Sequence, residues 1–170
     1  MDILTGTAQT KFGDHINTDD INPPQYFVSH KPEDLAKGCL KNIDPDFFEK
    51  MSKGGFVVAG KNFGCGSSRE TAPVAIKAAG AIAIVAEEFA RIFYRNAINI
   101  GLPVIECPGI AQHVDTGDEL KVNLKTGVVY NLTKNTEYQG IAIPEYLVEL
   151  IEAGGLFPLL KKRFAKEQEA

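Results

Sequence analysis

The stretch Ala81-Ile82-Ala83-Ile84-Val85-Ala86 decides the fold class. A run of small and β-branched apolar residues, with no polar residue between them, is typical of a parallel strand that is covered on both faces. Phe56–Ala59 and Leu102–Ile105 are two further short apolar runs, one on each side of it. Between the runs, helical patterns extend from Ser67 to about Ala79 and from Glu87 to Asn99. This order of strand, helix, strand, helix and strand predicts a parallel α/β layer with right-handed crossovers.

Further elements are predicted upstream of this layer. A helix is expected over Pro32–Gly38, because Pro32 suits the first helical position and Gly38 ends the pattern. A second helix is expected with Asp44 as N-cap and Pro45 at its first position, ending before Gly54. Residues 12–24 are rich in turn formers, and we expect a loop there.

The character of the chain changes after Gly109. Residues 118–124 alternate between polar and apolar, a turn follows, and residues 128–132 return, which predicts an antiparallel hairpin. Residues 144–153 predict a helix that ends at Gly154, and the charged C-terminus predicts a frayed helix. We therefore predict an α/β fold with a central, partly parallel sheet, flanked by helices and with an antiparallel hairpin appendage. We expect one domain over residues 1–170.

Composition excludes several classes of protein. The chain has 170 residues with 18 basic and 22 acidic side chains, so it offers no electrostatic basis for binding nucleic acid or an anionic membrane. With 44% hydrophobic and 24% charged residues, it has the composition of an ordered globular protein. We see no signal peptide at the N-terminus and no apolar run long enough to span a bilayer. We therefore expect a soluble, cytoplasmic protein.

The three cysteines, Cys39, Cys65 and Cys107, stand far apart. An odd number without short spacings does not fit a disulfide framework, a zinc site or a set of iron–sulfur ligands. We expect reduced thiols, and no metal or cofactor bound by this chain. Cys65 lies between two glycines of the segment discussed next, where it is either a reactive thiol or, in the reading we favour, a small loop residue.

Chemistry is concentrated in one segment, Gly60-Lys61-Asn62-Phe63-Gly64-Cys65-Gly66-Ser67-Ser68-Arg69-Glu70. Its glycines let the backbone turn sharply and approach a ligand closely. The N–H groups of a helix start favour a carboxylate or phosphate, and Arg69 adds a planar donor fork that matches a carboxylate. The phosphate-loop and dinucleotide-binding patterns are absent. The segment therefore predicts an anion site, unless Ser67 and Glu70 only form a capping box.

Three separated motifs give a resemblance to a known family. They are Gly64-Cys65-Gly66-Ser67-Ser68-Arg69-Glu70, Phe89-Ala90-Arg91-Ile92-Phe93-Tyr94-Arg95-Asn96-Ala97 and Gly101-Leu102-Pro103. Together they resemble the swivelling domain of the aconitase superfamily. As a separate chain of this length, the protein is similar to the small subunits of 3-isopropylmalate dehydratase and homoaconitase. One departure is Thr71, where many relatives carry His.

The resemblance implies a division of labour between two subunits. The serine that matches Ser67 is the base that moves a proton at carbon, and the arginine that matches Arg69 holds a substrate carboxylate. We expect Ser68, Gly64 and Gly66 to contribute to substrate binding. The [4Fe-4S] cluster is expected in a separate large subunit, and a dicarboxylate is expected as substrate. Such a subunit is a hydro-lyase component that acts only with its large partner.

The loop after Asn17-Thr18-Asp19 is where the family contacts the variable substituent of the substrate. In the family the motif itself lies near the active site, although Asp19 could also form only an Asx-turn. Phe27 and Val28 suit an alkyl group, because a carboxylate placed against them would lose hydration. We therefore predict isopropylmalate, in leucine biosynthesis. A dimethylmalate or homoaconitate hydro-lyase subunit and a non-enzymatic anion-binding module remain the alternatives.

Arg91 and Arg95 lie one helical turn apart and have Glu87 and Glu88 as possible partners. We interpret them as part of a solvated or subunit-facing helix rather than of the site.

Overall fold

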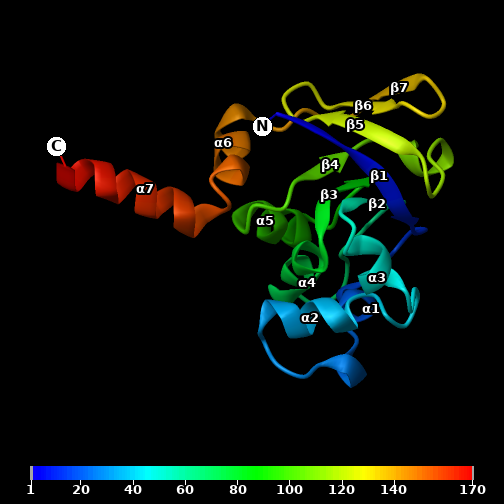
Figure 1. Cartoon of the computed structure of the whole chain (residues 1–170), viewed down its shortest axis with the longest axis horizontal. Coiled ribbons are helices and arrows are strands. Elements are labelled where there is room, and N and C mark those ends of the chain that lie inside the picture. The colour runs from blue at the N-terminus through cyan, green and yellow to red at the C-terminus, as the bar shows by residue number, and fades with distance from the viewer. Residues whose placement is uncertain (1, 170) are drawn as a thin grey trace.

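The computed structural model describes residues 2–169, which form a mixed sheet of seven strands in the order β4-β3-β2-β1-β5-β6-β7, flanked by helices (Figure 1). The strands are β1 (Ile3–Lys11), β2 (Gly55–Ala59), β3 (Ala81–Ala86), β4 (Val104–Glu106), β5 (Glu119–Asn123), β6 (Val128–Asn131) and β7 (Thr136–Gln139). The helices are α1 (Thr18–Ile21), α2 (Pro32–Gly38), α3 (Phe47–Met51), α4 (Thr71–Ala79), α5 (Arg91–Asn99), α6 (Glu145–Glu152) and α7 (Leu156–Glu169). Short 3-10 turns lie at Pro24–Tyr26 and Ile110–Gln112. The predicted α/β class is confirmed.

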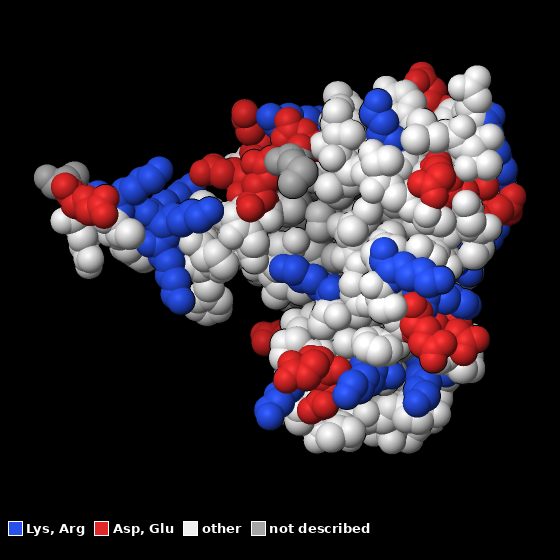
Figure 2. All heavy atoms as spheres, viewed as in Figure 1, with Lys and Arg blue, Asp and Glu red and all other residues white. Residues whose placement is uncertain are grey.

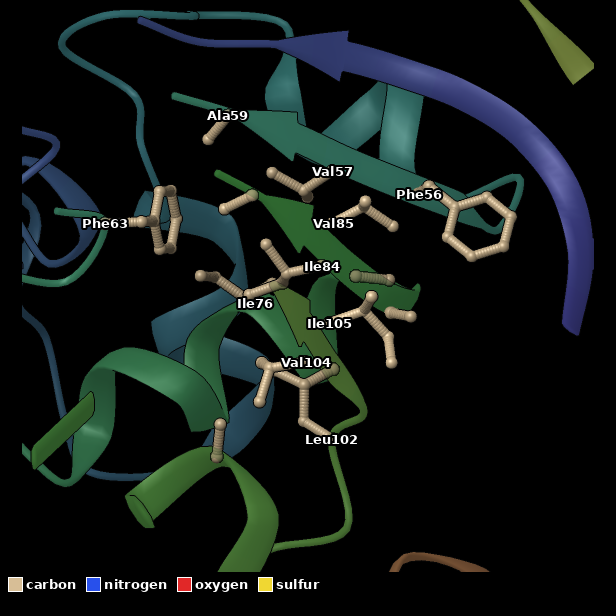
Figure 3. Packing of buried hydrophobic residues seen from close by; sticks show 14 of the residues in the cluster. Phe56, Val57, Ala59, Phe63, Ile76, Ile84, Val85, Leu102, Val104 and Ile105 are labelled. Atoms are coloured by element: carbon tan, nitrogen blue, oxygen red, sulfur yellow. The ribbon is translucent and has the colours of Figure 1, made fainter. Parts of the chain in front are cut away.

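The parallel layer of β2, β3 and β4 forms the centre of the core. Every residue of β2 and all but Ile82 of β3 are buried, as their unbroken apolar runs predicted. Figure 3 shows Val57 of β2, Ile84 of β3 and Val104 of β4 on the face of the layer that Ile76 of α4 covers, whereas Val85 and Ile105 point to the other face. Burial of these side chains on both faces is the main stabilising contribution in this layer.

β1 joins the two halves of the sheet, and the sequence did not predict it. It pairs in parallel with β2 and antiparallel with β5, so the predicted hairpin of β5 and β6 is a continuation of the main sheet rather than an appendage. β7 extends the sheet beyond β6 and was also not predicted. β1 contains three Thr residues and one Gly, and it has few buried side chains. Its place depends on ladder hydrogen bonds, which leave no hydrophobic periodicity in the sequence.

Two helices that follow the parallel strands begin later than predicted. α4 begins at Thr71 rather than Ser67, and α5 begins at Arg91 rather than Glu87. In both cases the preceding residues are held in extended or bent conformations by hydrogen bonds to neighbouring loops. The N-cap of α4 is Glu70, which makes no side-chain capping bond. The proposed capping box of Ser67 and Glu70 is therefore not formed.

The upstream helices agree with prediction in part. α2 spans Pro32–Gly38 as predicted, whereas α3 begins at Phe47 with Asp46 as N-cap, so Asp44 is not the cap. The Asp44 carbonyl accepts a bond from the Phe47 N–H at 3.0 Å, and its carboxylate pairs with Lys50 at 2.9 Å. Residues 44–47 therefore form a turn, and Pro45 lies in this turn instead of at the first position of the helix. The loop predicted at residues 12–24 contains α1, and the strand predicted at Leu102–Ile105 is shifted to Val104–Glu106.

The C-terminal helix α7 reaches out from the body next to α6 (Figure 1). Leu159 is its one buried residue within Leu156–Glu169, and Arg163 pairs with Glu149 of α6 at 3.6 Å. Figure 2 shows Lys and Arg side chains gathered along this arm, and they come from Lys161, Lys162, Arg163 and Lys166. Among residues 2–169, none of the helices combines the length and apolarity that crossing a bilayer requires.

Gly55 at the start of β2 provides a test of the β1–β2 junction. Its φ is +141°, and a Cβ there would lie 2.5 Å from the Thr7 carbonyl oxygen of β1. We expect Gly55→Ala to destabilise the fold by about 2 kcal/mol or more, because both the backbone conformation and the strand pairing oppose it. Urea denaturation followed by circular dichroism measures this. Gly13→Ala is the matched control, since its Cβ would meet nothing within 4 Å, and equal stability of the two variants would contradict the expectation.

Candidate active site

Three loops meet at the carboxyl edge of the parallel strands, where α/β sheets commonly bind ligands. Residues 12–17 follow β1, residues 60–66 follow β2 and residues 87–90 follow β3. Backbone hydrogen bonds join the first loop to the second and the second to the third. They are Gly60 N to Gly13 O (3.2 Å), His15 N to Lys61 O (2.8 Å), Gly64 N to Ile16 O (2.7 Å), Phe63 N to Glu88 O (3.0 Å) and Ala90 N to Phe63 O (2.9 Å). The glycine-rich loop is therefore fixed from both sides.

The glycine-rich loop rests on an aromatic floor. Phe63 contacts Phe89 and Phe93 edge-on, with ring centroids 6.0 and 5.3 Å apart. Gly64 has a φ of +83°, and a Cβ there would lie 2.2 Å from the Phe93 Cγ atom. Only glycine permits this close approach of the loop to α5. The fixed loop directs the next residues, Ser67 to Arg69, out over the carboxyl edge.

The short helix α1 braces the segment that carries the predicted site residues. Thr18 is buried, and its hydroxyl donates to the Ser67 carbonyl oxygen at 2.8 Å. Asn22 donates from Nδ2 to the Thr71 hydroxyl at 2.8 Å. Thr71 thus completes a hydrogen bond at the start of α4. α1 therefore holds both ends of the segment from Ser67 to Thr71.

Asp19 forms an ion pair with Arg69. Asp19 Oδ1 lies 2.6 Å from Arg69 Nη2, and Arg69 Nη1 donates to the Asn22 carbonyl oxygen at 3.4 Å. The Asx-turn considered for Asp19 is not its role here, since Asn17 caps α1 in a reciprocal pair with Asp20. Both Asp19 and Arg69 are partly exposed, so the pair contributes little to stability. Its effect is to orient the guanidinium.

Most of the predicted site residues line one hollow of about 210 Å³. They are Gly64, Gly66, Ser67, Ser68 and Arg69. The two serine side chains are exposed, and within residues 2–169 their hydroxyls have no hydrogen-bond partner. In the same part of the chain, the backbone N–H groups of Gly66, Ser67 and Ser68 also have no acceptor. The hollow thus offers two hydroxyls, three backbone donors and a guanidinium, which together suit an anion with an oxygen-rich head.

A second hollow of about 400 Å³ lies on the other side of Arg69. Phe27 lines it together with His30, whose ring meets the Phe27 ring edge-on at 5.0 Å between centroids. Val28, predicted beside Phe27, is 77% exposed and lines neither hollow. Arg69 lines both hollows, so a ligand bound to its guanidinium would extend toward Phe27.

Arg91, which the sequence analysis assigned to a solvated or subunit-facing helix rather than to the site, is among the residues that line this hollow. It is the first residue of α5, and besides the 210 Å³ hollow it borders another hollow of about 300 Å³. The pairing considered between Arg91 or Arg95 and Glu87 or Glu88 does not occur among residues 2–169. The sequence signal that points to Arg91 is its position, because it starts the helix after β3 and so lies at the same edge as the loop after β2.

The described residues do not form a metal or iron–sulfur site. No group of three or more His, Cys, Asp or Glu side chains within residues 2–169 is arranged to hold a metal ion. Cys39 and Cys107 are buried, and Cys65 is half-buried in the glycine-rich loop. Burial raises the pKa of Cys39 well above its usual value and, with the nearby Glu87 carboxylate, raises the pKa of Cys107 to about 11. Within residues 2–169 the three thiols do not come together as the set of cysteines that usually holds a [4Fe-4S] cluster.

The chain matches known proteins over most of its length. Residues 5–109 match the aconitase C-terminal domain family. The chain is 54% identical to the isopropylmalate/citramalate isomerase small subunit of Methanocaldococcus jannaschii over 93% of this chain and 94% of that protein. It is 50% identical to the 3-isopropylmalate dehydratase small subunit of Lachnoclostridium phytofermentans over 90% and 93%. A crystal structure of a 3-isopropylmalate dehydratase from M. jannaschii matches with a TM-score of 0.90 and 41% identity, covering 98% of each chain.

Alkylation of the three cysteines tests whether Cys65 in the glycine-rich loop is accessible while Cys39 and Cys107 are buried. The thiolate is the species that reacts with iodoacetamide, and a pKa of about 11 leaves about 0.1% of Cys107 ionised at pH 8. We expect iodoacetamide at pH 8 to label Cys65 of the native protein while Cys39 and Cys107 stay unlabelled. Peptide mass spectrometry measures the rates, and labelling in denaturant is the control in which all three react. Labelling of native Cys107 as fast as Cys65 would contradict this arrangement.

Proposed function

Because this chain belongs to the aconitase C-terminal domain family and is a hydro-lyase small subunit of the isopropylmalate dehydratase type, we propose that it works with a large subunit to isomerise an alkyl-substituted malate. Isopropylmalate is the proposed substrate, in leucine biosynthesis, and citramalate, which carries a methyl group, fits the same site. The observation that carries the proposal is the convergence of Ser67, Ser68 and Arg69 on one hollow.

Ser67 is proposed as the catalytic base. Isomerisation removes a hydroxyl from one carbon and a proton from its neighbour, and then returns them in exchanged positions. The Ser67 oxygen takes that proton and later gives it back to carbon. A serine hydroxyl is a weak base in water, so its alkoxide needs donors and positive charge nearby. The unpaired N–H groups of Gly66 to Ser68 and the Arg69 guanidinium support this role.

Arg69 is proposed to hold the carboxylate next to the carbon that loses its proton. A guanidinium has five N–H donors in a planar fork, and two of its nitrogens already meet Asp19 and Asn22. This leaves further donors for a substrate carboxylate in a fixed direction. As carbon loses its proton, negative charge develops on that carboxylate, and Arg69 stabilises it. Ser68 adds a hydroxyl donor in the same hollow.

The variable substituent of the substrate is proposed to meet Phe27. Phe27 lines the second hollow beside Arg69, so a substrate anchored at Arg69 would present its alkyl group to the phenyl ring. A further carboxylate in that place would lose hydration without a cation of its own, because Arg69, the one Lys or Arg that lines this hollow, is already assigned to the anchoring carboxylate. His30 shares this wall and offers a ring N–H as a hydrogen-bond donor.

The large subunit is proposed to hold the [4Fe-4S] cluster that the family uses. The cysteines of this chain do not fit such a cluster, as described above, and the part of the structure that covers residues 2–169 holds no alternative metal-binding group. The removal of the substrate hydroxyl is therefore assigned to the partner. This chain contributes the proton transfer and part of the substrate recognition.

The first test of this proposal concerns Ser67. In the complex reconstituted with the large subunit, Ser67→Ala is expected to lower kcat by about 1,000-fold or more, because no other base replaces the hydroxyl. Steady-state turnover of isopropylmalate is the measurement. Ser52→Ala is the matched control, since Ser52 precedes β2 and so lies at the opposite edge of the sheet. Full activity of Ser67→Ala would contradict the role of base, and an inactive wild-type complex would favour an anion-binding module.

The second test concerns the substituent of the substrate that is proposed to meet Phe27. The wild-type complex is expected to use isopropylmalate at least about 100-fold better than homocitrate, measured as kcat/KM, because of the desolvation of a carboxylate at Phe27. Phe27→Arg is expected to reverse or narrow this ratio. Gln25→Arg adds the same charge to the same loop, outside the hollow, and is expected to leave the ratio unchanged. A wild-type preference for homocitrate would assign the chain to the homoaconitate hydro-lyases instead.

A further inference from the structure

We propose that Thr18 is a positioning residue for the proposed base. Its N–H and its hydroxyl hold the carbonyl groups of Cys65 and Ser67, so that the N–H groups of Gly66 and Ser68 face away from α1 and stay free for the Ser67 oxygen. This inference rests on the proposed function, in which Ser67 moves the proton. Thr18 acts through the backbone of the segment rather than on the substrate.

Thr18 makes two hydrogen bonds to the segment that carries the base. Its N–H donates to the Cys65 carbonyl oxygen at 2.9 Å, and its hydroxyl donates to the Ser67 carbonyl oxygen at 2.8 Å. Both donors are available because Thr18 is the first residue of α1. The first N–H groups of a helix have no acceptor within it, and a hydroxyl at its start has no helix carbonyl one turn earlier to bond.

These two bonds fix the direction of two further N–H groups. The peptide bonds that follow Cys65 and Ser67 are trans, and in a trans peptide the N–H points opposite to the C=O. Because both carbonyls face Thr18, the N–H groups of Gly66 and Ser68 face away from it. Neither N–H has an acceptor within residues 2–169. The two free donors therefore lie on the same side of the segment, one before and one after Ser67.

α1 holds Thr18 in a fixed position. Asn17 and Asp20 cap the helix reciprocally, since Asp20 N–H donates to Asn17 Oδ1 at 2.9 Å and Asn17 N–H donates to Asp20 Oδ2 at 3.0 Å. A parallel β-bridge joins Asn17 to Cys65, directly before the residues that Thr18 binds. The Thr18 hydroxyl is therefore presented to Ser67 from a rigid backbone, and the order of the donors costs little at the moment of reaction.

Thr10 of β1 separates the hydrogen bond of a threonine from its burial. Thr18 is 2% exposed and Thr10 is 3% exposed. The Thr10 hydroxyl, however, has no hydrogen-bond partner in the part of the chain that the structure describes, and Thr10 does not line the 210 Å³ hollow. Replacing Thr10 by Val thus removes a buried hydroxyl and no hydrogen bond. The same replacement at Thr18 removes the bond to Ser67 and keeps the shape of the side chain.

The first measurement is turnover of isopropylmalate by the complex reconstituted with the large subunit. Thr18→Val is expected to lower kcat about 10- to 100-fold and to change KM less than about threefold, because misplaced donors stabilise the transition state less and leave ground-state binding intact. Thr18→Ser keeps the hydroxyl and is expected to recover kcat to within about threefold of wild type. Thr10→Val is the matched control and should leave both constants unchanged. Urea denaturation verifies that each variant is folded in the assay.

The second measurement does not depend on turnover. Ser67→Cys, made together with Cys65→Ala, introduces a thiol at the position of the proposed base, while Cys39 and Cys107 are buried. Nearby N–H groups favour the thiolate. Adding Thr18→Val is therefore expected to lower the fraction of this thiol that is ionised at pH 7 by about threefold or more. Adding Thr18→Ser instead should leave it unchanged, and the pH dependence of the alkylation rate of the small subunit measures both.

A lowered kcat and a lowered ionised fraction with Thr18→Val, both restored with Thr18→Ser, support the proposal. An unchanged kcat overturns it, as does a loss that Thr18→Ser does not recover. An unchanged ionised fraction also overturns it, because the hydroxyl would then have a structural role alone. If Ser67→Ala keeps full activity or the wild-type complex is inactive, the proposed function fails and this inference fails with it. If Ser67→Ala is inactive while Thr18→Val keeps its kcat, this inference alone fails.

Discussion

The approach of Gly64 to Phe93 is the constraint on which the site depends. A side chain at Gly64 would overlap the Phe93 ring, so the loop after β2 can lie directly on α5 only with glycine at this position. That contact brings the Gly64 N–H to the Ile16 carbonyl oxygen at 2.7 Å and sets the loop between its two neighbours. The carboxyl ends of three parallel strands are thereby joined into one surface. The exposed side chains of Ser67 and Ser68 follow directly on a backbone that is already fixed.

The segment from Ser67 to Thr71 combines a fixed backbone with exposed side chains. Ser67 and Ser68 are exposed, yet the Ser67 carbonyl is bound by the buried Thr18 and the segment ends at the Thr71 hydroxyl, which Asn22 holds. Donors held in place need little reorganisation when charge develops on a substrate. An open hollow of this kind also lacks the wall that excludes water. A partner that closes over it would supply that wall, which agrees with the chemistry being divided between two chains.

Hydrophobic pattern predicted the parts of the fold that bury apolar side chains. The run from Ala81 to Ala86 matches β3 residue for residue, because both of its faces are covered. β1 was not predicted, since its Thr and Gly residues are held by hydrogen bonds to β2 and β5 rather than by burial. The starts of α4 and α5 were placed four residues too early for a related reason. Contacts between loops far apart in the sequence hold those residues out of the helix, and no local pattern records such contacts.

In the candidate site, too, local sequence patterns could be predicted and contacts between distant segments could not. Residue type and spacing made Ser67 to Arg69 the site candidates, and the structure places all three beside one hollow. The partner of Arg69 could not be predicted, since Asp19 meets it only through the packing of α1 against the loop after β2. An acidic residue beside a carboxylate-binding arginine lowers the local positive potential, so it weakens the attraction of a dianion. It also limits the guanidinium to one orientation, which reduces the entropy lost when a carboxylate binds. The ion pair with Asp19 therefore exchanges positive potential at Arg69 for a fixed orientation of its guanidinium.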